Sequence, residues 1–144
     1  MKHLALTLLL PALPVAAAGP FTLRTDLDSD GTAEQVQIAA DGITVTGGKM
    51  AGQFPRPAGV PVPSGDASDS GIRFADLNGD GLADLLFADE AHEAIHLWTR
   101  QARADLGWLP GWSQQVRSAP RTAGPDRLPP LTGTTVSVKD GIVS

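Results

Sequence analysis

Two short acidic segments, 50 residues apart, carry the residue types that bind hard cations. They read DLDSDGTAE at residues 26–34, the first acidic loop, and DLNGDGLAD at residues 76–84, the second acidic loop. In each, oxygen-bearing side chains occupy positions 1, 3 and 5, glycine occupies position 6, and a carboxylate occupies position 9. Calcium takes six to eight oxygen ligands at about 2.3–2.6 Å, and the glycine permits the sharp turn that gathers them. The spacing therefore predicts two Ca²⁺ sites, in each of which position 7 adds its main-chain carbonyl. The expected ligands are Asp26, Asp28, Asp30, Thr32 and Glu34 in the first loop and Asp76, Asn78, Asp80, Leu82 and Asp84 in the second.

Charge repulsion supports the same interpretation. The first acidic loop has four carboxylates within nine residues, and the second has three together with the amide of Asn78. Like charges this close repel one another unless a cation lies among them. The second loop is expected to be the better site, because position 9 of the first carries the longer side chain of Glu34. The alternative is a pair of solvated Asp/Gly turns between strands.

The flanking sequence does not fit an EF-hand. That loop has 12 residues, ends in a bidentate glutamate and is flanked by helices. Position 12 is Gln37 in one loop and Phe87 in the other, and neither side chain is a carboxylate. Because the neighbouring residues alternate between apolar and polar, as strands do, we expect each acidic loop to join two strands.

A second motif, HEAIH at residues 92–96, matches the H-E-x-x-H pattern of zinc-dependent hydrolases. In those enzymes a helix presents both histidines to zinc, and a third protein ligand completes the site. Candidates for that third ligand are scarce, because the remaining histidine of the sequence is His3 and no glutamate follows the motif. Residues 89–104 have helix-forming composition, but residues 95–99 alternate as a strand does. We therefore expect no enzymatic activity and retain a zinc hydrolase as an alternative.

Period-two alternation dominates the rest of the chain and predicts an all-β fold. Residues 47–71, which contain six glycines and four prolines, and residues 117–133 are expected to be connections without regular structure. The strands are expected at residues 21–25, 36–39 and 43–46, at residues 72–75, 85–88, 95–99 and 112–116, and from residue 134 to 138. Together they predict two antiparallel meanders and the start of a further strand.

The first 18 residues have the features of an export signal. Lys2 is followed by an apolar stretch over residues 4–15 and by alanines at positions 16 and 18. A membrane span needs about 20 apolar residues, and this stretch is shorter and contains two prolines. We expect cleavage after Ala18, a secreted or periplasmic protein, and no membrane span after cleavage.

Composition narrows the classes of partner. The chain has 144 residues, a formal net charge of −5 and no cysteine. Loss of the signal removes one basic residue and no acidic residue, which makes the charge −6. An acidic chain without a basic cluster is not expected to bind nucleic acid. Small exported domains are often cross-linked by disulfides. Because this chain has no cysteine, bound metal is the expected cross-link.

The segment GIRFADLNGDGLADLLFA, residues 71–88, closely resembles the FG-GAP or VCBS repeat of integrin-like β-propellers in exported bacterial proteins. The resemblance covers about residues 20–46 and 70–116. It implies that each acidic loop joins two strands of a propeller blade and binds calcium through the loop positions named above. Propellers have four to eight four-stranded blades. The chain is therefore expected to form an incomplete propeller of about two units.

The expected organisation is a signal peptide followed by two repeat units and two connections. Gly111-Trp112-Ser113 also resembles the segment that follows such repeats in large exported dehydrogenase-like proteins with a cytochrome c domain, but the chain lacks C-x-x-C-H. Only three residues follow Gly141, too few for a returning strand, so an N-terminal segment of a longer protein is expected. Its function is expected to be structural or binding, with calcium ions and with further blades or a protein or glycan ligand as partners. The boundaries are residues 1–18, 19–46, 47–71, 72–116 and 117–144.

Overall fold

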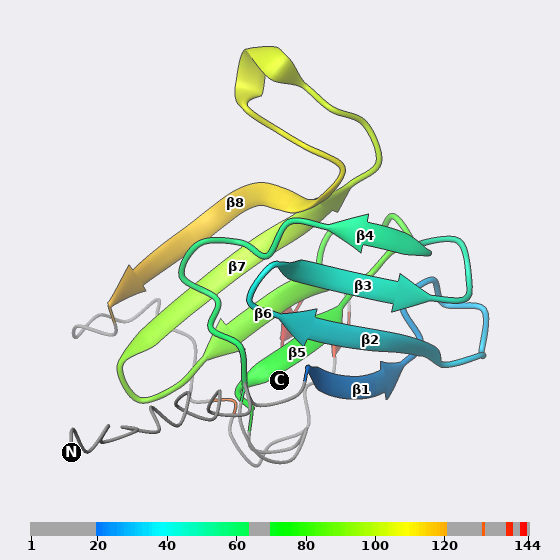
Figure 1. Cartoon of the computed structure of the whole chain (residues 1–144), viewed down its shortest axis with the longest axis horizontal. Coiled ribbons are helices and arrows are strands. Elements are labelled where there is room, and N and C mark those ends of the chain that lie inside the picture. The colour runs from blue at the N-terminus through cyan, green and yellow to red at the C-terminus, as the bar shows by residue number, and fades with distance from the viewer. Residues whose placement is uncertain (1–19, 64–69, 121–130, 132–137, 140–141, 144) are drawn as a thin grey trace, which may run out of the picture.

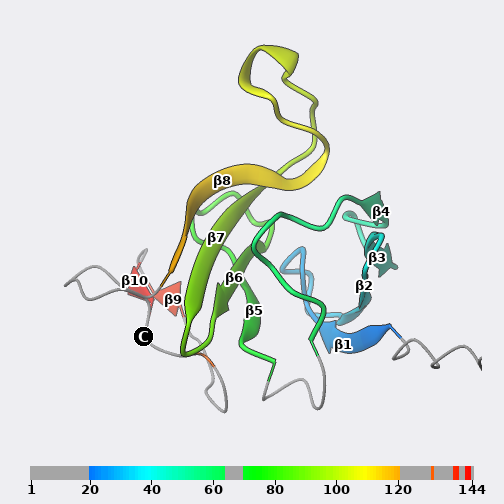
Figure 2. The ribbon, with the colours of Figure 1, turned by 60° about the vertical axis from the view of Figure 1, so that its left-hand side comes forward.

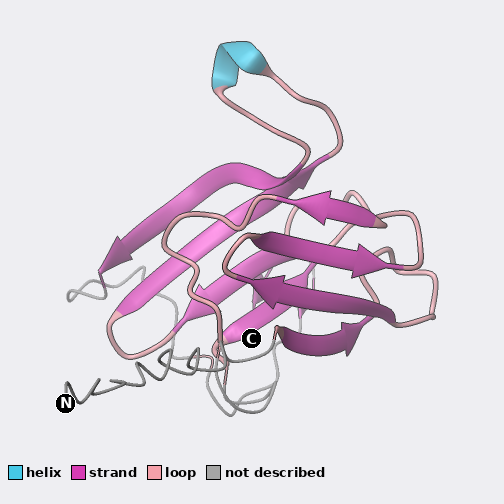
Figure 3. Ribbon diagram, in the orientation of Figure 1, coloured by secondary structure: helices cyan, strands magenta, loops and turns pink. Residues whose placement is uncertain are grey.

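Two four-stranded antiparallel meanders make up most of the structure, which is a computed structural model describing residues 20–63, 70–120, 131, 138–139 and 142–143 (Figures 1 and 3). In both sheets the spatial order of the strands follows the sequence. The predicted all-β class with antiparallel meanders is confirmed. The first sheet consists of β1 (Phe21–Thr25), β2 (Glu34–Ala39), β3 (Gly42–Thr46) and β4 (Gly52–Phe54). The second consists of β5 (Ile72–Ala75), β6 (Asp84–Ala88), β7 (His92–Thr99) and β8 (Gly111–Pro120).

The core lies between the two sheets, which stand next to each other in Figure 2. Alternate residues of β2 and β3 are buried, because successive side chains of a strand point to opposite faces. The aromatic rings of Phe54 and Trp98 lie edge to face at 4.7 Å between centroids, and those of Trp98 and Trp112 at 4.8 Å. Phe54 belongs to β4, so this contact joins the first sheet to the second.

The strand β4 was not predicted, since it lies inside the Gly/Pro-rich connection. It is only three residues long and pairs with β3 through Gly52, Gln53 and Phe54. Such a short run carries no detectable periodicity, and the pairing with β3 makes it a strand. Pro55 follows directly and cannot donate to a ladder. Strand pairing also explains the length of β8. The expected end was residue 116, but β8 pairs along β7 as far as His92 and therefore continues to Pro120.

Part of the far face of the second sheet is also covered. Leu131 is 2% exposed, packs with Leu86 and Ala88 of β6, and donates its backbone N–H to the Ala88 carbonyl at 3.1 Å. All five residues of β6 are therefore buried. Between β7 and β8, a protruding segment contains the 3-10 helix η2 (Ala104–Leu106).

The expectation that the last residues are too few to pair is wrong. β9 (Val138–Lys139) and β10 (Ile142–Val143) form a two-stranded antiparallel pair. The predicted signal peptide, residues 1–18, lies outside the described residues. Within the described ranges, none of the helices has the length and apolar character to cross a membrane.

Candidate metal site in the first acidic loop

The two acidic loops occupy equivalent places in the two sheets. The first joins β1 to β2, and the second joins β5 to β6, as predicted from the strand-like flanks. Position 4 has positive φ in both loops, at 61° for Ser29 and 76° for Gly79. Position 6 is also left-handed, at 86° for Gly31 and 82° for Gly81, a conformation that glycine adopts without strain. The local sequence therefore imposes the same backbone turn twice.

Aspartates hold each turn by accepting backbone hydrogen bonds. In the first loop, Asp26 Oδ2 accepts the Gly31 N–H at 2.9 Å and Asp30 Oδ1 accepts the Thr32 N–H at 2.7 Å. The second loop repeats both bonds, from Gly81 N–H to Asp76 Oδ2 at 2.8 Å and from Leu82 N–H to Asp80 Oδ1 at 2.9 Å. Positions 1 and 5 therefore shape the turn as well as carrying negative charge.

Four carboxylates converge in the first loop. Asp26, Asp28, Asp30 and Glu34 each offer an oxygen, and these oxygens all lie within 4.8 Å of one another. Asp26 and Asp30 are exposed, whereas Asp28 is 5% and Glu34 is 3% exposed. The group is thus open to solvent on one side and closed on the other. A single cation at its centre would be shared by all four, because calcium–oxygen distances are about 2.3–2.6 Å.

The turn between β3 and β4 closes the buried side of this group. The Lys49 N–H donates to Asp28 Oδ2 at 2.8 Å, and this hydrogen bond is the main cause of the lowered pKa of Asp28, against the effect of burial. A Cβ on Gly48 would lie 2.7 Å from Asp28 Oδ2 and 2.8 Å from Glu34 Oε1, so a larger residue there would displace these carboxylates. Sequence reasoning missed this turn. The Gly47-Gly48 pair was the available signal.

The second loop brings its residues together differently. Asp84 is fully buried, and its two oxygens accept the N–H groups of Leu77 and Trp98, each at 2.8 Å. Burial raises the pKa of Asp84 despite both hydrogen bonds, and the charges of Asp80 and Asp76 add to the rise. In the described residues, the carboxylates of this loop do not form a group like that of the first.

The carboxylates thus converge in the first loop, whereas the second loop was the one expected from the sequence to be the better site. The extra methylene of Glu34 is the reason. Its Oε2 reaches the Leu27 N–H at 2.7 Å, as Asp84 reaches Leu77, while its Oε1 lies beside Gly48 with the other carboxylates. At position 3, the second loop has the uncharged Asn78 where the first loop has the charged Asp28.

One main-chain hydrogen bond links the two loops, and a tryptophan side chain extends it to the core. The Ala83 N–H donates to the Leu27 carbonyl at 2.7 Å, and the indole N–H of Trp112 donates to the Ala83 carbonyl at 3.0 Å. Leu27 also donates its N–H to Glu34. A series of hydrogen bonds thus connects the carboxylate group of the first sheet to the aromatic core of the second.

The HEAIH segment is a strand, which removes the helical geometry of a zinc hydrolase. Four residues of a strand span about 13 Å, so His92 and His96 are not adjacent as they would be on a helix. The ring Nε2 of His92 lies 3.1 Å from Ser118 Oγ. The carboxylate of Glu93 is buried and forms an ion pair with Arg117, with Oε1 and Nε 2.5 Å apart.

The chain has two four-stranded antiparallel meanders, each with an acidic glycine loop between its first two strands, and this architecture is consistent with two β-propeller blades. In agreement, residues 26–87 match the family model of the FG-GAP-like repeat. The matched range extends from the first acidic loop to β6, and FG-GAP repeats form propeller blades. Neither a curated protein nor a solved structure matches the chain.

Proposed function

We propose that this chain is an exported calcium-binding blade module with a structural role and no catalytic activity. The observation that carries the proposal is the convergence of four carboxylates in the first loop. A set of oxygen donors suits a hard cation, and calcium accepts more oxygen ligands in less regular geometry than magnesium does. Thr32 would add its main-chain carbonyl, as expected from position 7.

The ion would fasten three segments together. Asp26, Asp28 and Asp30 come from the loop, Glu34 begins β2, and the turn at Gly48 lies against two of these carboxylates. A cation would offset their mutual repulsion and hold the loop against that turn. Because Leu27 is hydrogen-bonded to Ala83, the ordering would extend to the neighbouring blade. The ion would thereby serve in place of a disulfide in a chain without cysteine.

Two blades do not close a propeller, since propellers have at least four. We therefore propose that further blades, or a protein or glycan ligand, contact this module. The signal-like sequence of residues 1–18 supports the proposal of a secreted or periplasmic location.

The test is thermal and urea unfolding with and without 10 mM CaCl₂, with MgCl₂ as a parallel arm. With a dissociation constant of about 10⁻⁴ to 10⁻³ M, typical of extracellular sites, calcium would add about 1.4 to 2.7 kcal/mol to the free energy of unfolding. Asp26→Asn should abolish this gain. Asp76→Asn is the matched control, because it changes the same position of the second loop and should retain the gain.

Two outcomes would contradict the proposal. One is the absence of any calcium-dependent change in stability. The other is an equal calcium response in Asp26→Asn and the unmodified protein, which would remove the site from the first loop. An equal response to magnesium would retain a cation site and contradict the choice of calcium.

A further inference from the structure

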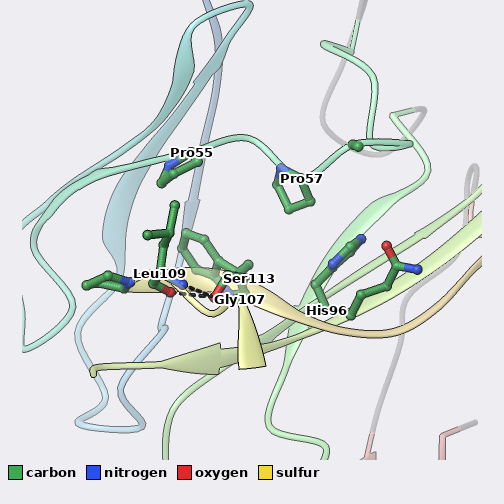
Figure 4. Close-up of a pocket in the computed structure, with 10 residues that line it drawn as sticks. Pro55, Pro57, His96, Gly107, Leu109 and Ser113 are labelled. Atoms are coloured by element: carbon green, nitrogen blue, oxygen red, sulfur yellow. Dashed lines mark hydrogen bonds between the residues drawn. The ribbon is translucent and has the colours of Figure 1, made fainter. Parts of the chain in front are cut away.

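A pocket of about 150 Å³ lies between the segment that follows β4 and the strands β7 and β8. Figure 4 shows it with Pro57 and His96 at one end and Pro55 and Leu109 at the other. Trp112 also lines it. None of the residues proposed to bind calcium lines this pocket, so a ligand in the pocket can be tested independently of an ion in the acidic loop.

His96 is the unusual member of this lining. Its side chain is only 2% exposed, and neither ring nitrogen has a hydrogen-bond partner among the described residues. A buried polar group without a partner costs about 1–3 kcal/mol, so such groups in native proteins call for a specific reason. Burial lowers the pKa of His96, which keeps the imidazole neutral at pH 7. A neutral imidazole has one N–H donor and one acceptor nitrogen.

The remaining walls are uncharged and mainly apolar, and Ser113 and Gln115 are the other polar side chains that line them. Prolines at positions 55, 57 and 110, together with Leu109 and Trp112, provide most of them, and no lining side chain is an acid, a lysine or an arginine. A cavity of about 150 Å³ holds one benzene-sized ring. A hydroxyl group on that ring would both donate and accept, so it could pair with either tautomer of His96.

We propose that this pocket binds a single uncharged six-membered ring carrying a hydroxyl group, with the hydroxyl on His96 and the ring against Trp112 and the prolines. The shared chemistry is that of a phenol, whether in a free small molecule or in the tyrosine side chain of another protein. The 144 residues of the sequence contain no tyrosine.

The test is calorimetric titration of the full chain with phenol, with benzene as the apolar control and N-acetyltyrosinamide as the third probe. Phenol should bind at least tenfold more tightly than benzene. His96→Phe should remove that difference, whereas His92→Phe should retain it, because His92 already has Ser118 as a partner. Binding of N-acetyltyrosinamide as tight as that of phenol would point to a tyrosine side chain, and its exclusion would point to a free small molecule.

A second measurement on the unmodified protein does not depend on how the variants fold. Addition of phenol should shift the ¹⁵N resonances of the His96 ring and leave those of His92 in place. Equal affinity for phenol and benzene, no binding of either up to the solubility limit of the probe, or unchanged His96 resonances would overturn the proposal.

Discussion

Replacement of Trp112 by phenylalanine removes the side chain that joins the aromatic core to the second acidic loop. Trp112 is 1% exposed, and its indole N–H donates to the Ala83 carbonyl at 3.0 Å. Its ring contacts Trp98, Phe54 and Phe74 at centroid distances of 4.8, 5.8 and 5.2 Å. Phenylalanine keeps an aromatic ring in this cluster but has no hydrogen-bond donor.

Two losses set the size of the effect. The buried Ala83 carbonyl loses this donor, which costs about 1–3 kcal/mol. Phenylalanine is smaller than tryptophan by roughly 40 Å³, and a residual cavity costs about 24 cal/mol per Å³, or about 1 kcal/mol. We expect Trp112→Phe to lower the free energy of unfolding by about 2–4 kcal/mol.

The assay is urea unfolding followed by far-ultraviolet circular dichroism, which does not rely on tryptophan emission. Trp108→Phe is the matched control, since Trp108 is only half-buried, in the loop around η2, and should lose less than about 1 kcal/mol. A loss below 1 kcal/mol for Trp112→Phe, or an equal loss in both variants, would refute the role assigned to this hydrogen bond and contact cluster.

Three further predictions address the acidic loops and the buried histidine. Asp84→Asn leaves one of two backbone N–H groups without an acceptor and should lower the free energy of unfolding by about 1–3 kcal/mol in urea unfolding, whereas the exposed Asp80→Asn should change it less. Gly48→Ala should weaken calcium binding in a terbium-luminescence competition more than Gly107→Ala does, because both have similar positive φ but only the first adds a Cβ within 3 Å of carboxylate oxygens. Since burial lowers the pKa of His96 below the unfolded value of 6.5, the unfolded state binds the proton more readily, so stability should fall as the pH drops below about 6.5. Unfolding midpoints measured between pH 7 and 5 should fall less in His96→Phe, and an identical decline would contradict the assignment.

Much of the loop geometry could be predicted from the sequence, because it depends on local interactions. The hydrogen bonds that shape each turn connect residues no more than five apart, such as Asp26 with Gly31 and Asp76 with Gly81. The alternating flanks placed both loops between strands. β4 was missed, because its three residues are a strand only through pairing with β3.

The sequence by itself determined the class of the fold, the repeated acidic loop and the oxygen donors within it, since alternation and turn-forming residues act over a few neighbours. The tertiary structure decided what happens at position 9. Asp84 is taken up by the backbone of Trp98, 14 residues away, whereas Glu34 stays with its loop under Gly48. The structure also decided that HEAIH is a strand, through pairing with β6 and β8 on either side. Such partners lie in neighbouring strands and turns of the same sheet, beyond the few residues over which alternation and turn formation act, and strand pairing brings them within reach.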